Sequence, residues 1–276
     1  MRLFSYFLGI LLLICSSCAV TKHKNIPYVL TENTDLTSHI FQPKKETTKL
    51  HPVLIFVHGG NWNSGKKETY GFLGRNFAKK GVVSVIPDYT LSPKANYEKM
   101  TQEIAKNIVW VKKNIENYGG NPQQIYVTGH SAGGHLVALA VMNPKYGIDQ
   151  NDISGIILND AAGLDMFSYL QKNPPTSENN YLTTWSNDPN TWEKASPINY
   201  MSENTPSILQ YWGSKSYLSI IEANQDFYNT LEEFQPNLEK IVLKKKHVPM
   251  VLQYIWPWSK RYDEILHFMD TTKTSN

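Results

Sequence analysis

The sequence predicts an α/β fold in which a mostly parallel central sheet is covered by helices on both faces. Short apolar runs rich in β-branched residues are typical of strands buried on both faces, and they alternate along the chain with amphipathic stretches of helical period. This alternation favours parallel strands joined by helical crossovers. A chain of 276 residues is compatible with one such domain, which we place at residues 31–272.

The individual elements follow from these two patterns. The run Val-Leu-Ile-Phe-Val at 53–57 is typical of a buried strand, and Gly81 ends the helix that follows it. Further strands are expected at 82–86, 125–127, 153–158, 207–211 and 238–243. Helices are expected at 66–80, 96–118, 132–142, 222–234 and 258–270.

One stretch, residues 161–204, interrupts the alternation. It contains Pro174-Pro175 and many aromatic side chains, and it follows the end of a predicted strand. Because a long insertion at such a point in a compact domain is usually functional, we expect a small cap over a site. The aromatic side chains suit stacking on sugar or phenolic rings, although a core role for most of them is equally consistent with their chemistry.

The N-terminus has the order of an export signal. A positive charge at Arg2 precedes the apolar run 3–14, and small residues lead up to Cys18. Small residues before a cysteine resemble the lipobox of bacterial lipoproteins, which predicts a signal segment over 1–18, a lipid on Cys18 and a polar tether over 19–30. A plain signal peptide or an uncleaved anchor is the alternative. The protein is therefore expected to be exported and lipid-anchored in the bacterial cell envelope, on the periplasmic or outer-membrane face.

The charge and the cysteine content argue against a nucleic-acid-binding protein and against a disulfide-bonded domain. The net charge is only +3, its lysines are scattered, and the run Lys244-Lys245-Lys246 is better explained as a solvated strand end. We expect no nucleic-acid partner. Both cysteines lie in the N-terminal segment, so the mature domain has no internal disulfide.

The run Gly129-His130-Ser131-Ala132-Gly133 carries the clearest chemical signal. It fits G-x-S-x-G and stands between a predicted strand and a predicted helix. A tight turn there pushes the serine oxygen out of the sheet, and the flanking glycines relieve the crowded backbone. The helix N-terminus also favours the negative charge that develops during acyl transfer. We therefore expect Ser131 to be a nucleophile rather than part of a glycine-rich turn without catalysis.

A second motif, His58-Gly59-Gly60-Asn61-Trp62, directly follows the strand at 53–57. Its backbone N–H groups can approach a substrate oxygen, so we expect Gly60 and Asn61 to form an oxyanion hole with the N–H of Ala132. His58 is expected to brace this loop by hydrogen bonding rather than to act as a base.

Together with Asp88-Tyr89-Thr90-Leu91-Ser92-Pro93, these motifs resemble the fold-3 branch of the α/β-hydrolases, which includes hormone-sensitive-lipase-like esterases and acetyl-xylan and feruloyl esterases. The resemblance covers roughly residues 35–270. It implies an α/β-hydrolase fold and a Ser–Asp–His triad without a metal or an organic cofactor. The chain departs from the pattern at Asn61, where a third glycine is usual, so the loop loses freedom.

In this fold the base follows the serine along the chain. His135 is one helical turn from Ser131, and His267 lies in the predicted terminal helix. His247 follows the strand 238–243 in a predicted loop and matches the place of the family's catalytic histidine, so we expect His247 to be the base.

The acid is harder to assign. The resemblance implies Gly-x-x-Asp after the strand before the last one, but Ser216 stands at that position. A serine cannot stabilise an imidazolium as a carboxylate does. Asp160 closes the neighbouring strand and is our candidate, and Asp165 lies five residues further on. The alternative is that both carboxylates only organise the first turn of the cap.

These observations favour a serine esterase that acts on small acyl esters, with acetyl or feruloyl groups on carbohydrate as candidate substrates. Two alternatives remain. One is an amidase or formamidase of the same fold, since His58-Gly59-Gly60-x-Trp62 also resembles kynurenine formamidases. The other is a catalytically impaired hydrolase scaffold that binds a glycan or a partner, which the missing aspartate supports.

Overall fold

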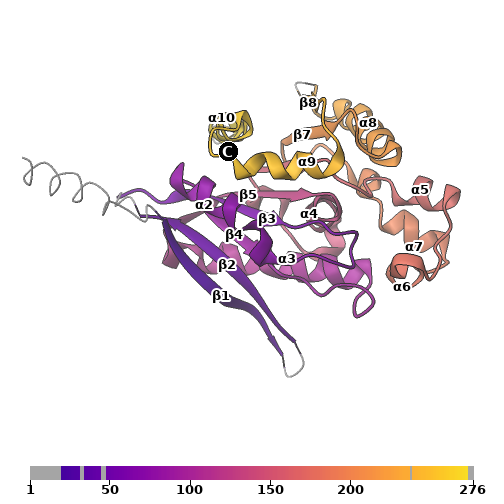
Figure 1. Cartoon of the computed structure of the whole chain (residues 1–276), viewed down its shortest axis with the longest axis horizontal. Coiled ribbons are helices and arrows are strands. Elements are labelled where there is room, and N and C mark those ends of the chain that lie inside the picture. Colours follow the sequence, from indigo (N-terminus) through magenta and orange to yellow (C-terminus); the bar gives the residue numbers. More distant parts are fainter. Residues whose placement is uncertain (1–19, 32–33, 45–47, 237, 273–276) are drawn as a thin grey trace, which may run out of the picture.

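The computed structural model describes residues 20–31, 34–44, 48–236 and 238–272, so the predicted signal segment and Cys18 lie outside the described residues. Its centre is an eight-stranded sheet in the order β1-β2-β4-β3-β5-β6-β7-β8 (Figure 1). The strands are β1 (Val20–Thr31), β2 (Thr34–Pro43), β3 (His51–Val57), β4 (Val83–Pro87), β5 (Gly120–His130), β6 (Gly155–Asn159), β7 (Ile208–Gly213) and β8 (Glu239–Leu243). Strands β3 to β8 run parallel to one another, whereas β2 pairs antiparallel with both β1 and β4. The predicted fold class is confirmed.

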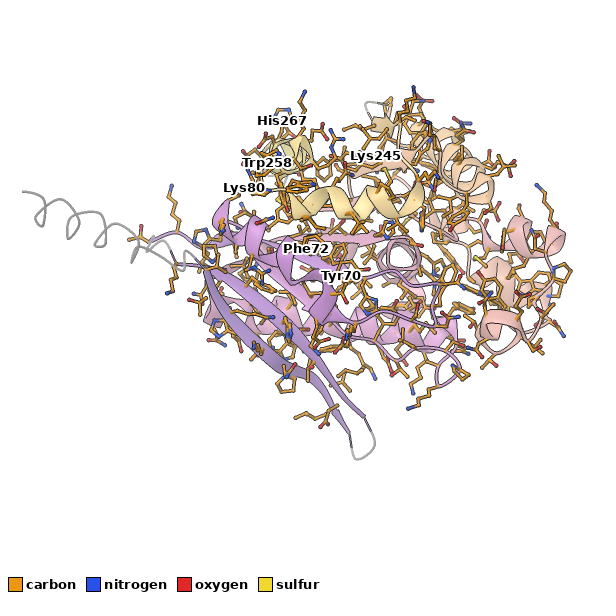
Figure 2. The ribbon with its side chains drawn as sticks, viewed as in Figure 1. Tyr70, Phe72, Lys80, Lys245, Trp258 and His267 are labelled. Carbon is orange, nitrogen blue, oxygen red and sulfur yellow. The ribbon has the colours of Figure 1, made fainter. Side chains whose placement is uncertain are left out.

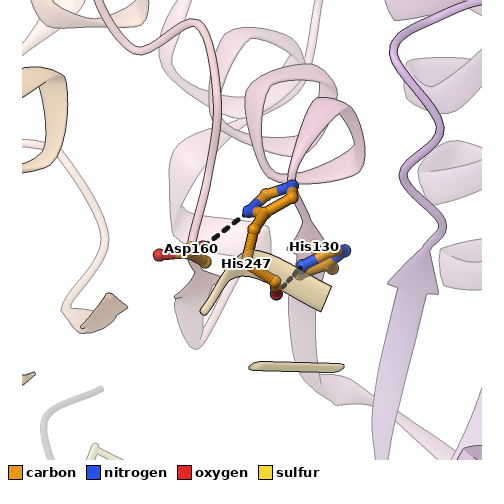
Figure 3. Close-up of side chains that lie close together, drawn as sticks. All are labelled: His130, Asp160 and His247. Carbon is orange, nitrogen blue, oxygen red and sulfur yellow. Dashed lines mark hydrogen bonds and ion pairs between the residues drawn. The ribbon is translucent and has the colours of Figure 1, made fainter. Parts of the chain in front are cut away.

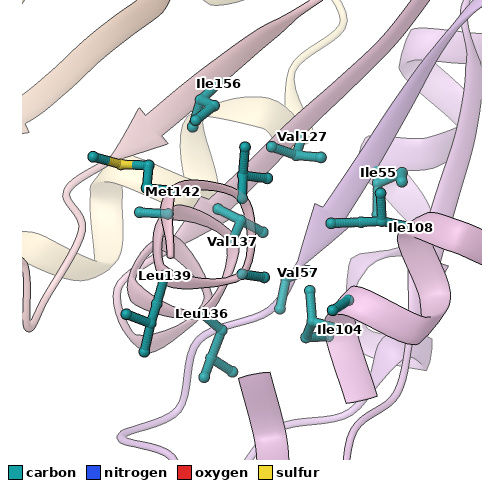
Figure 4. Packing of buried hydrophobic residues seen from close by; sticks show 14 of the residues in the cluster. Ile55, Val57, Ile104, Ile108, Val127, Leu136, Val137, Leu139, Met142 and Ile156 are labelled. Atoms are coloured by element: carbon teal, nitrogen blue, oxygen red, sulfur yellow. The ribbon is translucent and has the colours of Figure 1, made fainter. Parts of the chain in front are cut away.

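Helices cover both faces of the sheet because side chains alternate along each buried strand. Val53, Ile55 and Val57 of β3 face one apolar cluster, whereas Leu54 and Phe56 face another. The first cluster includes side chains of α3 (Tyr97–Asn114) and α4 (Ala132–Met142) (Figure 4), and of α8 (Leu218–Glu232). The second includes side chains of α2 (Gly71–Lys79), α9 (His247–Leu252) and α10 (Lys260–Thr272). No helix in the described ranges has the length and apolar character needed to cross a bilayer.

The prediction of a tether over 19–30 was wrong where the structure describes it, because residues 20–31 form β1 and pair with β2. Tyr28 is buried, and its hydroxyl donates to the backbone carbonyl of Asp88 beyond β4. An edge strand has one neighbour and a largely solvated face, so its polar side chains gave no clear alternation in the sequence. Strand β2 was not predicted either.

The insertion at 161–204 contains α5 (Met166–Lys172), α6 (Tyr181–Trp185), α7 (Pro189–Lys194) and short 3-10 turns. Its tryptophans belong to the core: Trp185 is fully buried, with its ring 5.4 Å from Tyr97 and 4.8 Å from Trp62. Tyr169 and Tyr181 instead line a pocket. The insertion therefore contributes buried tryptophans to the core and two tyrosines to the lining of the pocket.

Candidate active site

Ser131 occupies the turn between β5 and α4. Its backbone has φ 55° and ψ −126°, a conformation that L-residues rarely adopt. The turn needs its glycines, because a Cβ on Gly129 would lie 2.3 Å from the backbone of Gly133, and a Cβ on Gly133 would lie 2.1 Å from the carbonyl oxygen of Val57. The sequence therefore builds a strained turn that places one serine hydroxyl at the carboxyl end of the sheet.

His247 lies beside that hydroxyl. Its Nε2 is 2.9 Å from the Oγ of Ser131. The loop predicted around this histidine is shorter than expected, because His247 is already the first residue of the helix α9. Lys244 and Lys246 are exposed in the connection after β8, as predicted for a solvated strand end.

Asp160 completes the line of side chains. It follows β6, has φ 50° and is fully buried. Its Oδ2 lies 2.6 Å from the Nδ1 of His247 (Figure 3), and its Oδ1 accepts a hydrogen bond of 2.8 Å from the N–H of Gly213. A buried carboxylate is tolerated when it is paired and hydrogen-bonded in this way.

Ser216 and Asp165 have roles other than that of the carboxylate beside His247. The hydroxyl of Ser216 donates to the Oδ2 of Asp160 at 2.6 Å and lies 3.4 Å from the Nδ1 of His247. The residue at the expected acid position therefore supports a carboxylate that comes from the neighbouring strand. Asp165 caps α5 by accepting from the N–H of Ser168 at 2.9 Å. For this residue the structure therefore shows the alternative role, in which the carboxylate organises the first turn of the cap.

The other histidines are held away from Ser131. His135 accepts from the indole N–H of Trp62 at 3.2 Å and donates to the carbonyl of Ala195 at 2.8 Å, and burial lowers its pKa to about 4. His267 is exposed on α10 (Figure 2) and is not among the residues that line the pocket with Ser131. His58 donates from Nδ1 to the carbonyl of Gly59 at 2.9 Å, which is the loop contact that the sequence predicted, and burial lowers its pKa.

His130 was not singled out from the sequence, although it lies inside the G-x-S-x-G motif. Its Nε2 donates to the backbone carbonyl of His247 at 3.1 Å (Figure 3). Burial, with His247 alongside, lowers its pKa to about 3, so the ring stays neutral. Ligand atoms of His130, Asp160 and His247 lie within 4.8 Å of one another, a spacing that a metal ion could use. The hydrogen bonds of these atoms give them another role, and the expected absence of a metal stays a prediction.

The predicted oxyanion loop is fixed through its carbonyl groups. The carbonyl of Gly59 accepts from His58, and the carbonyl of Gly60 accepts from the N–H of Asn63 at 3.1 Å and of Ser64 at 2.9 Å. In a trans peptide the C=O and the N–H point in opposite directions. These bonds therefore set the directions of the N–H groups of Gly60 and Asn61, which line the same pocket as Ser131.

The same argument applies to Ala132. The carbonyl of Ser131 accepts from the N–H of Gly134 at 2.9 Å and of Ala162 at 3.1 Å, which turns the N–H of Ala132 the other way. This N–H belongs to the first turn of α4, where helical N–H groups have no partner within the helix and favour negative charge. Preorganised donors of this kind stabilise an oxyanion.

A pocket of about 630 Å³ opens over Ser131. Residues from the oxyanion loop, the cap and α9 surround it, and its lining includes both aromatic and polar side chains. Its aromatic members include Tyr70, Tyr169, Tyr181 and Tyr217. The pocket has the size and mixed lining of a small-molecule site.

A family model described as BD-FAE matches residues 39–231. Esterase LipC of Mycobacterium tuberculosis (strain ATCC 25618 / H37Rv) is 29% identical over 206 residues, which are 70% of this chain and 51% of LipC. Kynurenine formamidase of Salmo salar is 34% identical over 116 residues, 42% of this chain and 37% of that enzyme. The chain thus spans about half or less of these relatives. An inhibited esterase B from Lactobacillus rhamnosis has a similar fold, with a TM-score of 0.79, 17% identity and coverage of 98% of this chain and 95% of the other.

Proposed function

The chain belongs to the BD-FAE family of α/β-hydrolases, and from this premise we propose that it is a serine esterase that cleaves small acyl esters through an acyl-enzyme. The resemblance drawn from the sequence motifs is thereby confirmed at the level of the family. The observation that carries the proposal is the continuous line from the Ser131 hydroxyl through His247 to the buried carboxylate of Asp160.

In the proposed reaction the Oγ of Ser131 attacks the ester carbonyl carbon while its proton passes to the Nε2 of His247. Asp160 holds the Nδ1–H of the imidazole and balances the charge of the imidazolium. The N–H groups of Gly60, Asn61 and Ala132 stabilise the tetrahedral oxyanion. The alcohol leaves with the proton from His247, and water then releases the acid by the same steps, with His247 taking the proton of the water.

We propose carbohydrate-linked acetyl or feruloyl esters as the substrate class. Tyr169 and Tyr181 offer rings for stacking on a sugar or a phenol, and Asp165 and Asn179 offer polar groups beside them. The relatives favour two reaction types, since one is named an esterase and another a formamidase. An amide or formamide substrate is therefore the second candidate, and it needs the same three side chains.

The function is tested with the purified protein on p-nitrophenyl acetate and with a fluorophosphonate probe. We expect hydrolysis, and a single covalent adduct on the peptide that contains Ser131, found by mass spectrometry. A panel of acetylated sugars, feruloyl esters and formamides then ranks the substrate classes by kcat/KM. A folded protein that neither hydrolyses these compounds nor labels would support the glycan-binding alternative instead.

We also propose export and lipid attachment at Cys18. In the sequence Cys18 is separated from β1, which begins at Val20, by one residue. A lipid on this cysteine would therefore keep the edge of the sheet close to the bilayer surface, because no long tether lies between them. Through this lipid anchor the membrane is the proposed partner of the protein.

Mass spectrometry of the mature N-terminus, after expression in a bacterium, is expected to find a diacylated Cys18. The protein should then fractionate with membranes, whereas Cys18→Ser should release it. A mature chain that begins with an unmodified residue 19 would contradict the lipid anchor and leave a plain signal peptide.

A further inference from the structure

The oxyanion loop contains two non-glycine residues with positive φ. Asn61 has φ 52° and Trp62 has φ 57°. Such a conformation is strained for an L-residue and persists only where its surroundings hold it. The contacts that hold these two residues therefore act, together with the bonds to the Gly60 carbonyl, on where the N–H of Asn61 points.

Trp62 is held by the core of the domain. Its side chain is 3% exposed, its indole N–H donates to His135 at 3.2 Å, and its carbonyl accepts from the N–H of Ser92 at 2.9 Å. Its ring also lies edge-on to the buried ring of Trp185. These contacts come from buried side chains and from the backbone of Ser92.

Asn61 is held by the cap. Its Oδ1 accepts a hydrogen bond of 2.7 Å from the hydroxyl of Tyr181, the first residue of α6. Burial raises the pKa of this tyrosine, so the hydroxyl keeps its proton. A second hydrogen bond links the same loop to the cap, from the side-chain N–H of Asn63 to the carbonyl of Asn179 at 2.9 Å.

A glycine at position 61 would have no side chain for Tyr181 to hold. The departure from the usual glycine thus exchanges loop freedom for a direct hydrogen bond to the cap. Tyr181 lines the pocket together with Tyr169 of α5. The bond from the Tyr181 hydroxyl to Asn61 therefore links the wall of the pocket to the oxyanion loop.

We propose that Tyr181 is a positioning residue for the oxyanion hole. Its hydroxyl fixes the side chain of Asn61, and through it the direction of the Asn61 N–H, so that the placement of the cap determines how well the oxyanion is stabilised. This inference rests on the proposed esterase function. It assigns Tyr181 an effect on turnover through Asn61, separate from any contact with the substrate.

The test is a double-mutant cycle measured on p-nitrophenyl acetate, a substrate too small to need the whole pocket. Loss of one neutral hydrogen bond corresponds to about a threefold to tenfold effect. We expect Tyr181→Phe to lower kcat by that factor with KM changed less than about twofold, since an oxyanion contact acts mainly in the transition state. In an Asn61→Gly background the same change should alter kcat less than about twofold.

Tyr200→Phe is the matched control, because it also removes a phenol hydroxyl of the insertion, which donates to the carbonyl of Lys194 at 3.1 Å. It should leave kcat unchanged.

If the effects of Tyr181→Phe and Asn61→Gly on kcat simply multiply, or if Tyr181→Phe raises KM alone, Tyr181 acts on the substrate and the inference is wrong. If Tyr181→Phe does not fold, Asn61→Gly removes the same bond, and an unchanged kcat there overturns the inference. A wild-type protein without hydrolysis contradicts the esterase function itself.

Discussion

Asp160→Asn is expected to lower kcat by about 10⁴-fold, the size of effect seen when a triad loses its carboxylate. An asparagine in this place can neither balance the charge of the imidazolium nor hold the imidazole of His247 in the same tautomer. Its amide oxygen can still accept from the N–H of Gly213, and asparagine tolerates the positive φ of this position. Circular dichroism and the melting temperature should therefore stay close to those of the wild type.

Two matched variants separate the candidates for the acid. Ser216→Ala removes one donor to Asp160 and leaves the carboxylate beside His247, so we expect kcat to fall less than about tenfold, as for one hydrogen bond. Asp165→Asn keeps an oxygen for the N–H of Ser168 and should also lower kcat/KM less than about tenfold. The assignment is wrong if either of these is more damaging than Asp160→Asn.

The nucleophile turn and the oxyanion loop could be predicted because each is encoded by neighbouring residues. Gly129, Ser131 and Gly133 are close in the chain and sit between a strand and a helix, so their geometry depends on local backbone crowding. The bracing bond of His58 is equally local, since its acceptor is the carbonyl of the next residue. Local order of this kind is readable without knowing how the strands are arranged.

Asp160 could be proposed as the acid from the sequence, but the alternative that it only organises the cap stayed open, because the answer depends on which strand ends meet. Asp160 and His247 are 87 residues apart, and the sheet order brings β6, β7 and β8 side by side. Only this arrangement shows that a carboxylate after β6 reaches the imidazole while Ser216 after β7 supports it. The same reason hid the contact of Tyr181 with Asn61, which spans 120 residues.

Strand β1 was missed for a different physical reason. Among its residues 20–24 only Val20 is apolar, so no alternation of apolar and polar residues is visible, as expected for an edge strand with one face in contact with water. Asn25, with φ 53°, also interrupts the pairing with β2 and shifts the register of the strand. A period-two pattern cannot be seen across such a shift. The bond from Tyr28 to the carbonyl of Asp88 shows that this segment nevertheless belongs to the domain.

Ser131→Ala and Ser131→Gly are expected to lower kcat by about 10⁶-fold, the effect of removing the nucleophile from a triad. Both variants should also lose the fluorophosphonate label. In the Ser131→Ala background, adding Asp160→Asn should change the residual rate little, because the members of a triad act as a unit. A large further loss would mean that Asp160 acts on something other than His247 and Ser131.

The two variants should differ in stability, and this difference tests the strain at the turn. Alanine keeps a Cβ at φ 55°, so Ser131→Ala retains the strain of the wild type. Glycine removes about 1–3 kcal/mol of strain, and its greater freedom in the unfolded chain takes back about 0.5–1 kcal/mol. Ser131→Gly is therefore expected to melt about 2–4 °C above Ser131→Ala in calorimetry, as a net gain near 1 kcal/mol gives for a domain of this size. Equal melting temperatures would show that the turn stores no strain, and the position of the Ser131 hydroxyl at the pocket would then need another explanation than a backbone held against its preference.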